Sequence, residues 1–111
     1  MFERELLKGS LGLMLMALIE QGPMYGYLIA KEIRSLTDDV IDLKEGSLYP
    51  ALHRLEKEGM IEGYWQRRED GVDRRYYRIT AAGQAVLDER RAQWSRFSAA
   101  VSKVVSDAPS Q

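Results

Sequence analysis

A helical leucine pattern is followed within a few residues by two short segments with the composition of strands. Leu48, Leu52 and Leu55 are spaced i, i+4 and i+7, which places their side chains on one face of a helix. Gly59 directly after this pattern is typical of a left-handed helix end. We therefore predict a helix over residues 47–58, and any fold of this chain must place a hairpin immediately after it.

The predicted hairpin consists of residues 61–68 and 74–80. Both segments are rich in Tyr, Trp and Ile, residues that are enriched in strands, and residues 69–73 between them have the polar, glycine-containing composition of a turn. We assign Tyr77 and Ile79 to the core. Aromatic pairs ordinarily stabilise sheets, so we interpret Trp65, Tyr76 and Tyr77 of this hairpin as cross-strand packing rather than as base-stacking platforms.

Two helices are expected before this unit. Residues 5–21 are apolar on more than one face and stop at Gly22-Pro23, so that helix needs partners on two sides. Residues 25–36 have a narrower apolar stripe. A polar connection, residues 37–45, has room for one short strand and is closed by Gly46.

The starts of the last two helices are marked by particular residues. Pro50 makes the start of the 47–58 helix less sharp, but proline is tolerated in a first turn, and we place it there. Thr80 has the side chain of a helix cap and precedes a long helical stretch, residues 81–106.

The element order helix, helix, helix, hairpin, long helix predicts a mostly α (α+β) fold, a winged helix-turn-helix with a long C-terminal dimerisation helix. A chain of 111 residues with 45% hydrophobic residues can bury one modest core. We expect residues 1–80 to form the winged helix-turn-helix DNA-binding domain, residues 81–106 the dimerisation helix and residues 107–111 a disordered tail.

Composition excludes several functions. The chain has no cysteine and a single histidine, His53, which leaves no thiolate metal site or disulfide, and no glycine-rich phosphate loop is present. No apolar run reaches about 18 residues, the length that spans a bilayer. We expect a soluble, cytoplasmic protein that is not an enzyme and uses no cofactor, no metal and no membrane.

Local charge, rather than net charge, suggests a nucleic-acid partner. The net charge is −1, whereas DNA-binding domains are usually basic overall. Arginines nevertheless bracket the predicted turn, where they can reach phosphates or a narrow minor groove; they are Arg67, Arg68, Arg74 and Arg75. The alternative is that they only balance neighbouring acids and keep an exposed hairpin soluble.

The 47–58 helix has a polar face opposite its leucines. On a helical wheel Pro50, His53 and Lys57 lie there, flanked by Ser47, Tyr49 and Arg54. This face suits a major groove, because Arg pairs with guanine, Ser and His bond base edges, and Tyr reaches phosphate. The alternative is an ordinary solvated amphipathic helix.

Three stretches together resemble the PadR family of bacterial transcription regulators: GYLIAKEI at 26–33, EGSLYPALHRLEKEGMIE at 45–62 and DRRYYRITAAG at 73–83. The resemblance implies a homodimer that usually represses transcription, with its third helices in successive major grooves of double-stranded operator DNA and its wings on the flanking backbone. Carried over by position, the implied DNA contacts are Tyr25, Tyr27, Ser47, Tyr49, Pro50, His53, Arg54, Lys57, Arg74 and Arg75.

The last helix carries its own dimerisation pattern. Leu87, Trp94 and Val101 repeat every seven residues, and Phe97 and Val104 complete an a/d seam that only Arg90 interrupts. We expect dimerisation through the first and last helices, with Leu11 and Leu15 from the first, which would match operator half-sites about 34 Å apart.

Short PadR-like proteins can bind flat aromatic compounds between subunits, so the resemblance implies a small aromatic effector at Trp94 and Phe97. The alternative is that both side chains are simply interface core. A wider alternative is a winged-helix module that binds protein and no DNA, which would lack the steep salt dependence of phosphate contacts.

Overall fold

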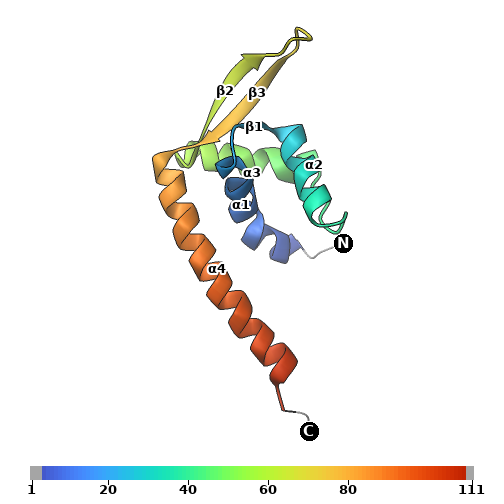
Figure 1. The fold of residues 1–111 in the computed structure, drawn as a ribbon, viewed down its shortest axis with the longest axis vertical. Coiled ribbons are helices and arrows are strands. Elements are labelled where there is room, and N and C mark those ends of the chain that lie inside the picture. The colour runs from blue at the N-terminus through green and yellow to red at the C-terminus, as the bar shows by residue number, and fades with distance from the viewer. Residues whose placement is uncertain (1–3, 110–111) are drawn as a thin grey trace.

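A computed structural model describes residues 4–109 and confirms the winged helix-turn-helix with its long C-terminal helix (Figure 1). The β2–β3 hairpin, called the wing below, projects at one end of the molecule, and α4 projects at the other. In chain order the elements are α1 (Arg4–Glu20), β1 (Met24–Tyr25), α2 (Gly26–Leu36), α3 (Glu45–Lys57), β2 (Ile61–Arg67), β3 (Asp73–Ile79) and α4 (Ala81–Asp107).

Helix α1 is the centre of the core. It packs against α2, α3, α4 and β3, as its broad apolar surface predicts. Leu11 and Leu15 are buried within the single chain, together with Met16 and Ile19. This placement runs against the expected dimer contacts of both leucines, because Leu15 is 0% exposed and Leu11 only 8%, which leaves little or no surface for a second subunit to cover.

The connection between α2 and α3 differs from the prediction. Residues 37–44 form a loop without a strand, in which Asp38 and Asp39 adopt left-handed backbone angles (φ 51° and 65°). Leu43 is buried and anchors the loop to the core. Helix α3 begins at Glu45, so Gly46 is its second residue and does not close the loop, and Pro50 lies in the second turn rather than the first.

The end of α3 matches the prediction. Gly59 has φ 78°, the left-handed conformation expected after a helix. Its N–H donates to the Glu56 carbonyl (3.0 Å), and the Met60 N–H donates to the Leu55 carbonyl (2.9 Å). This Schellman pattern satisfies the last carbonyls of α3 and turns the chain sharply into β2.

The sheet has one strand more than predicted. Its order is β1-β3-β2, all antiparallel, with Tyr25 opposite Tyr76 and Tyr76 opposite Tyr64. Tyr25 was expected to begin the second helix, but its backbone is extended (φ −101°, ψ 161°) and pairs with β3 before α2 starts. A two-residue strand is too short to leave a periodic signal.

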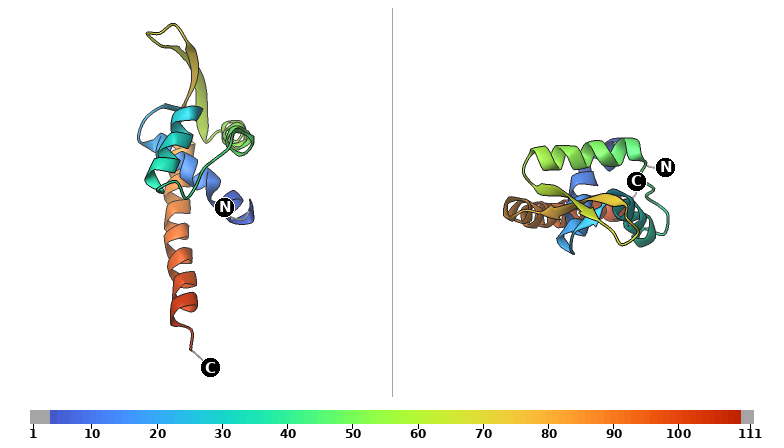
Figure 2. Two further views of the ribbon diagram at one scale, coloured as in Figure 1. Left: turned by 90° about the vertical axis from the view of Figure 1, so that its right-hand side faces the viewer. Right: turned by 90° about the horizontal axis from the view of Figure 1, so that it is seen from above.

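Helix α4 starts directly against the end of α3. Thr80 caps it as predicted, accepting a hydrogen bond from the Gly83 N–H (3.0 Å), while its hydroxyl donates to the Gly59 carbonyl (2.6 Å). A Cβ on Gly83 would lie 1.9 Å from the Met60 carbonyl oxygen. From this close junction α4 extends away from the domain, and the molecule measures 64 × 29 × 20 Å (Figure 2).

The junction gives a first prediction. Gly83→Ala should lower the free energy of unfolding by about 1–3 kcal/mol, because the new methyl group must displace backbone. The measurement is urea denaturation followed by circular dichroism. Gly46→Ala is the control: its Cβ would meet nothing within 4 Å, so no loss and a gain of up to about 1 kcal/mol are expected. Equal stability of wild type and Gly83→Ala would contradict the close packing.

A charged contact joins α1 to α4. Arg91 Nη2 donates to Glu20 Oε1 (2.8 Å) and Gln84 Nε2 donates to Glu20 Oε2 (2.6 Å). These hydrogen bonds, the one from Arg91 first, hold the pKa of Glu20 below its ordinary value. Because the folded pKa is depressed, the contact stabilises the protein above the unfolded pKa, about 4.3, and that stability is lost as the pH falls through the folded pKa.

Glu20→Gln should therefore lower the melting temperature at pH 7, and the difference from wild type should shrink as the pH is lowered and disappear near pH 3. Melting curves at pH 7, 5 and 3 measure this. Glu89→Gln serves as the control, since Glu89 is exposed on α4 without an ion-pair partner among residues 9–109. A difference that persists unchanged at pH 3 would refute the role of the Glu20 carboxylate.

Candidate nucleic-acid interface

The outer face of α3 is the side opposite its buried leucines Leu48, Leu52 and Leu55. All six side chains predicted to contact DNA from this helix are exposed: Ser47, Tyr49, Pro50, His53, Arg54 and Lys57. No hydrogen bond or ion pair ties the side chains of His53, Arg54 or Lys57 to other residues in the described part of the chain. They are available to an outside partner, and an unobstructed helix of this width fits a major groove.

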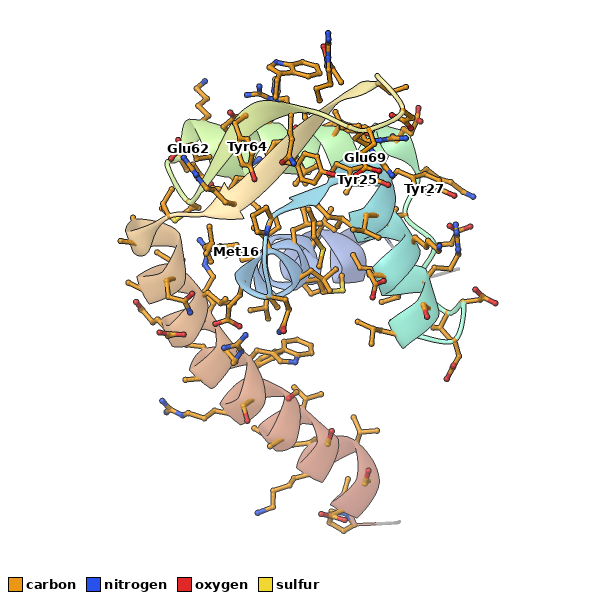
Figure 3. All side chains as sticks on the ribbon, turned by 45° about the horizontal axis from the view of Figure 1, so that its top comes forward. Met16, Tyr25, Tyr27, Glu62, Tyr64 and Glu69 are labelled. Atoms are coloured by element: carbon orange, nitrogen blue, oxygen red, sulfur yellow. The ribbon has the colours of Figure 1, made fainter. Side chains whose placement is uncertain are left out.

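Tyr49 leans from α3 across the start of α2. A Cβ on Gly26 would lie 2.7 Å from the Tyr49 hydroxyl oxygen and 2.8 Å from a ring carbon, so only glycine leaves room for the ring. Tyr27, one residue further, is 63% exposed and points away from the domain (Figure 3). The first turn of α2 thus places Tyr27 in solvent, and Gly26 in the same turn leaves room for the Tyr49 ring at the edge of the outer face of α3.

The face of the wing that is turned toward α3 is held by an ion pair. Arg75 Nη2 donates to Glu56 Oε2 (2.6 Å), and the Gly63 N–H donates to the same oxygen (3.2 Å). Tyr77 is buried beneath this pair, and its burial raises the pKa of the phenol. Arg75, expected as a DNA contact, is therefore engaged inside the protein.

Tyrosines and arginines line the opposite face of the wing. The Tyr76 ring packs against Tyr25 (5.4 Å between centroids) and stacks with Tyr64 (6.0 Å), which confirms the cross-strand packing predicted for Tyr76. The Arg74 guanidinium lies 4.6 Å from the Tyr25 ring centroid, and Arg68 donates to the Tyr25 hydroxyl (3.2 Å). The Tyr25 side chain thus supports the wing from β1.

Two arginines and a tryptophan lie toward the end of the wing, and of these Arg67 and Trp65 are exposed while Arg74 is half-buried. Arg67 pairs with Asp73 (3.1 Å) but stays 75% exposed. Arg74 makes no ion pair within residues 9–109, and its Nε is buried without a hydrogen-bond partner there. Trp65 is 66% exposed, and its cross-strand contact is with Arg75, whose guanidinium lies 5.8 Å from its ring centroid, rather than with another aromatic.

A groove of about 830 Å³ lies between α1, α3 and α4. Ser47 and Arg54 line it from α3, and Trp94 and Phe97 line it from α4. Arg54 therefore stands at the border between the outer face and this groove. Residues predicted for DNA and residues predicted for an effector therefore line the same groove, a proximity that no sequence pattern indicates.

The apolar seam of α4 is only partly covered. Leu87 is fully buried against the domain, so it belongs to the core of the single chain and offers no surface to a partner, contrary to its expected interface role. Further along the same stripe, Trp94, Phe97 and Val104 are 50%, 65% and 69% exposed. The stripe is therefore buried where α4 packs against the domain, at Leu87, and exposed where the helix extends beyond it.

Other classes of site are not found in the described residues. No group of three or more His, Asp or Glu side chains within residues 9–109 could hold a metal ion. No helix in the same part of the chain is long and apolar enough to cross a bilayer.

The fold and the exposed polar face of its third helix define a winged-helix DNA-binding regulator. A family model described as the transcriptional regulator PadR-like family matches residues 14–89. The chain belongs to this PadR-like family, as the sequence resemblance indicated, and its members are regulators rather than enzymes.

Individual proteins are similar to this chain in sequence or in structure. Protein X of Lysinibacillus sphaericus is 38% identical over 95 residues, covering 86% of this chain and 87% of that protein. A transcriptional regulator of Mycobacterium tuberculosis is 54% identical over 46 residues, 41% of this chain and 42% of that protein. A transcriptional regulator from Clostridium thermocellum has a similar structure (TM-score 0.84, 33% identity, 95% of this chain and 99% of that one). A PadR-like regulator from Bacillus cereus gives a TM-score of 0.80 at 32% identity, with 92% and 97% covered.

Proposed function

We propose that this protein is a cytoplasmic repressor that binds a palindromic operator as a homodimer and is released by a small aromatic ligand. The observation that carries the proposal is the outer face of α3, where His53, Arg54 and Lys57 are exposed, with no ion-pair or hydrogen-bond partner for their side chains among residues 9–109, beside a wing rich in arginine. Arg can read guanine in a major groove while wing arginines meet the adjacent backbone. Binding of this kind blocks a promoter without any chemical step.

The stripe on α4 supports a homodimer. The helix has 27 residues, about 40 Å, and only its first turns rest on the domain. Beyond Leu87 the same helix face exposes Trp94, Phe97, Val101 and Val104. A second copy of the chain supplies an identical stripe, and two such heptad seams pack against each other. Dimerisation would thus cover surface that a monomer leaves in water.

A two-fold dimer fits a palindrome. The two α3 helices would be related by the symmetry axis and would enter half-sites one DNA turn, about 34 Å, apart. Because α4 is fixed to the end of α3 through Thr80 and Gly83, the α4 pairing would set the separation of the two reading helices.

The groove between α1, α3 and α4 supports regulation by a ligand. Trp94 and Phe97 offer flat apolar surface, and Arg54 and Arg90 on the same walls offer hydrogen-bond donors and positive charge. An aromatic compound with an acidic group would fit this combination. Since Arg54 also borders the outer face, an occupied groove would compete with its DNA contact.

The DNA-binding proposal predicts that fluorescence anisotropy detects binding to the promoter upstream of the gene for this protein, with log affinity falling linearly with log salt. Arg54→Ala should weaken specific binding by about 1–3 kcal/mol through the loss of a base contact. Arg96→Ala, an exposed arginine on α4 away from α3, is the matched control and should bind like wild type. Equal affinity of wild type and Arg54→Ala at one salt concentration would reject the reading role of α3. Affinity without salt dependence would favour a protein-binding module instead.

The dimer proposal predicts a dimer for wild type at micromolar concentration in analytical ultracentrifugation. The double variant Trp94→Ala/Phe97→Ala should weaken dimerisation by several kcal/mol, because two large aromatic side chains leave the interface. Lys103→Ala, an exposed residue that helical spacing places on the side of α4 opposite this stripe, should remain dimeric. A monomeric wild type at that concentration would refute the proposal.

A further inference from the structure

Glu56 is an acidic residue on the helix that we propose reads DNA, and it connects that helix to the wing. We propose that Glu56 and Arg75 form a clamp that sets the position of the wing relative to α3. Arg75 then acts as a positioning residue and not as a phosphate contact. This inference rests on the proposed DNA binding and adds the device that orients its two contacting elements.

The contact joins three groups on three elements, α3, β2 and β3. Oε2 of Glu56 accepts from Arg75 Nη2 (2.6 Å) on β3 and from the Gly63 N–H (3.2 Å) on β2. Strand β2 lies at the edge of the sheet, so the Gly63 N–H has no neighbouring strand to bond. One carboxylate therefore satisfies a free edge donor and a cation at once, which binds both strands of the wing to α3.

Gly63 shows that the clamp needs a close approach. A Cβ at this position would lie 2.6 Å from Arg75 Nη2 and 2.7 Å from Glu56 Oε2. Any other residue would push the pair away from the strand. A glycine in the interior of a strand commonly marks such an approach, because it otherwise weakens the strand.

The surroundings of Arg75 hold it in place. Its guanidinium lies 5.9 Å from the Tyr77 ring centroid and 5.8 Å from that of Trp65. The side chains of Arg75 and Glu56 are 34% and 28% exposed, the least exposed of the described ion pairs. Moving Arg75 out to a phosphate would leave the half-buried Glu56 carboxylate without its cation, which costs more than breaking an exposed pair would.

Arg74 provides the contrast. It is the adjacent residue on β3, lies on the other face of the wing, and has no acidic partner among residues 9–109. Its guanidinium packs on the Tyr25 ring and its charge is not neutralised by an acid among residues 9–109, whereas the charge of Arg75 is neutralised by Glu56. The two neighbouring arginines, both expected from the sequence to contact DNA, therefore have different roles.

The test uses the sign of the effect. An acid near DNA repels phosphate, so removing it ordinarily leaves affinity unchanged or raises it. The clamp predicts the reverse for Glu56: Glu56→Ala should bind operator DNA about fivefold to tenfold more weakly than wild type, with a shallower salt slope because wing contacts are lost. Melting temperatures verify that every variant is folded at the assay temperature.

Two controls match the change in charge. Glu58→Ala removes an exposed acid from the end of α3, and Glu62→Ala breaks the Arg78–Glu62 ion pair (3.0 Å) inside the wing without touching α3. Both should bind DNA as well as wild type or better. A loss of affinity in Glu62→Ala equal to that in Glu56→Ala would overturn the clamp, since any weakening of the wing would then suffice.

A double-mutant cycle separates the roles of Arg75. Under the clamp, Arg75→Ala, Glu56→Ala and the double variant all lose affinity to a similar degree, because each breaks the same contact. Arg74→Ala, a phosphate contact, should add its loss independently to either. If Glu56→Ala binds more tightly than wild type while Arg75→Ala binds more weakly, Arg75 is a phosphate contact and the clamp is overturned.

The free protein provides a readout without DNA. The Gly63 amide should be protected from hydrogen exchange in wild type and should lose that protection in Glu56→Ala. An unprotected Gly63 amide in wild type overturns the clamp even if DNA binds normally. A protected amide in a wild type that binds no promoter DNA overturns the proposed function, and with it the role of the clamp in DNA binding.

Discussion

The contact that the rest of the structure depends on is the junction at the C-terminal end of α3. Gly59 and Met60 cap that helix, and their carbonyl groups accept hydrogen bonds from Thr80, the residue that starts α4. Gly83 then lies against the Met60 carbonyl with no space for a side chain. The chain leaves this junction as β2 and returns to it at the end of β3. Helix α3, the wing and α4, the proposed dimerisation helix, therefore all meet at this one point. A change in the pairing of two α4 helices would therefore move α3 directly.

Charge is divided between holding the structure and contacting a partner. The net charge of −1 does not indicate a DNA-binding protein, yet the outer face of α3 exposes Arg54 and Lys57 with no acid paired to either among the described residues. Many acids are instead paired within the fold: Glu56 with Arg75, Glu20 with Arg91 and Asp42 with Arg34 and Lys44. What a DNA phosphate would meet is decided by which cations remain unpaired, and not by the sum of charges.

The groove beside α3 brings the proposed effector site next to the proposed DNA-reading helix. Helices α1, α3 and α4 meet around this groove, and Arg54 of α3 and the exposed aromatics Trp94 and Phe97 of α4 both line it. A ligand or a second subunit in that groove would contact α3 directly. Its effect on α3 would not have to be transmitted through a long chain of intervening residues. Coupling over such a short distance requires only that the occupant favours one position of Arg54 over another.

The sequence by itself determined the order of the elements, the leucine face and cap of α3, the cap at Thr80 and the PadR-like family, because these depend on local spacing and on residues adjacent in the chain. Tertiary structure decided which similar residues have different roles. Leu11, Leu15 and Leu87 fit an interface pattern but lie in the core, since periodicity identifies an apolar face and not what covers it. The strand at Tyr25 and the pairing of Arg75 with Glu56 join elements far apart in sequence. Gly63 inside a strand was the one local signal of that pairing, and only its three-dimensional neighbours show what approaches it.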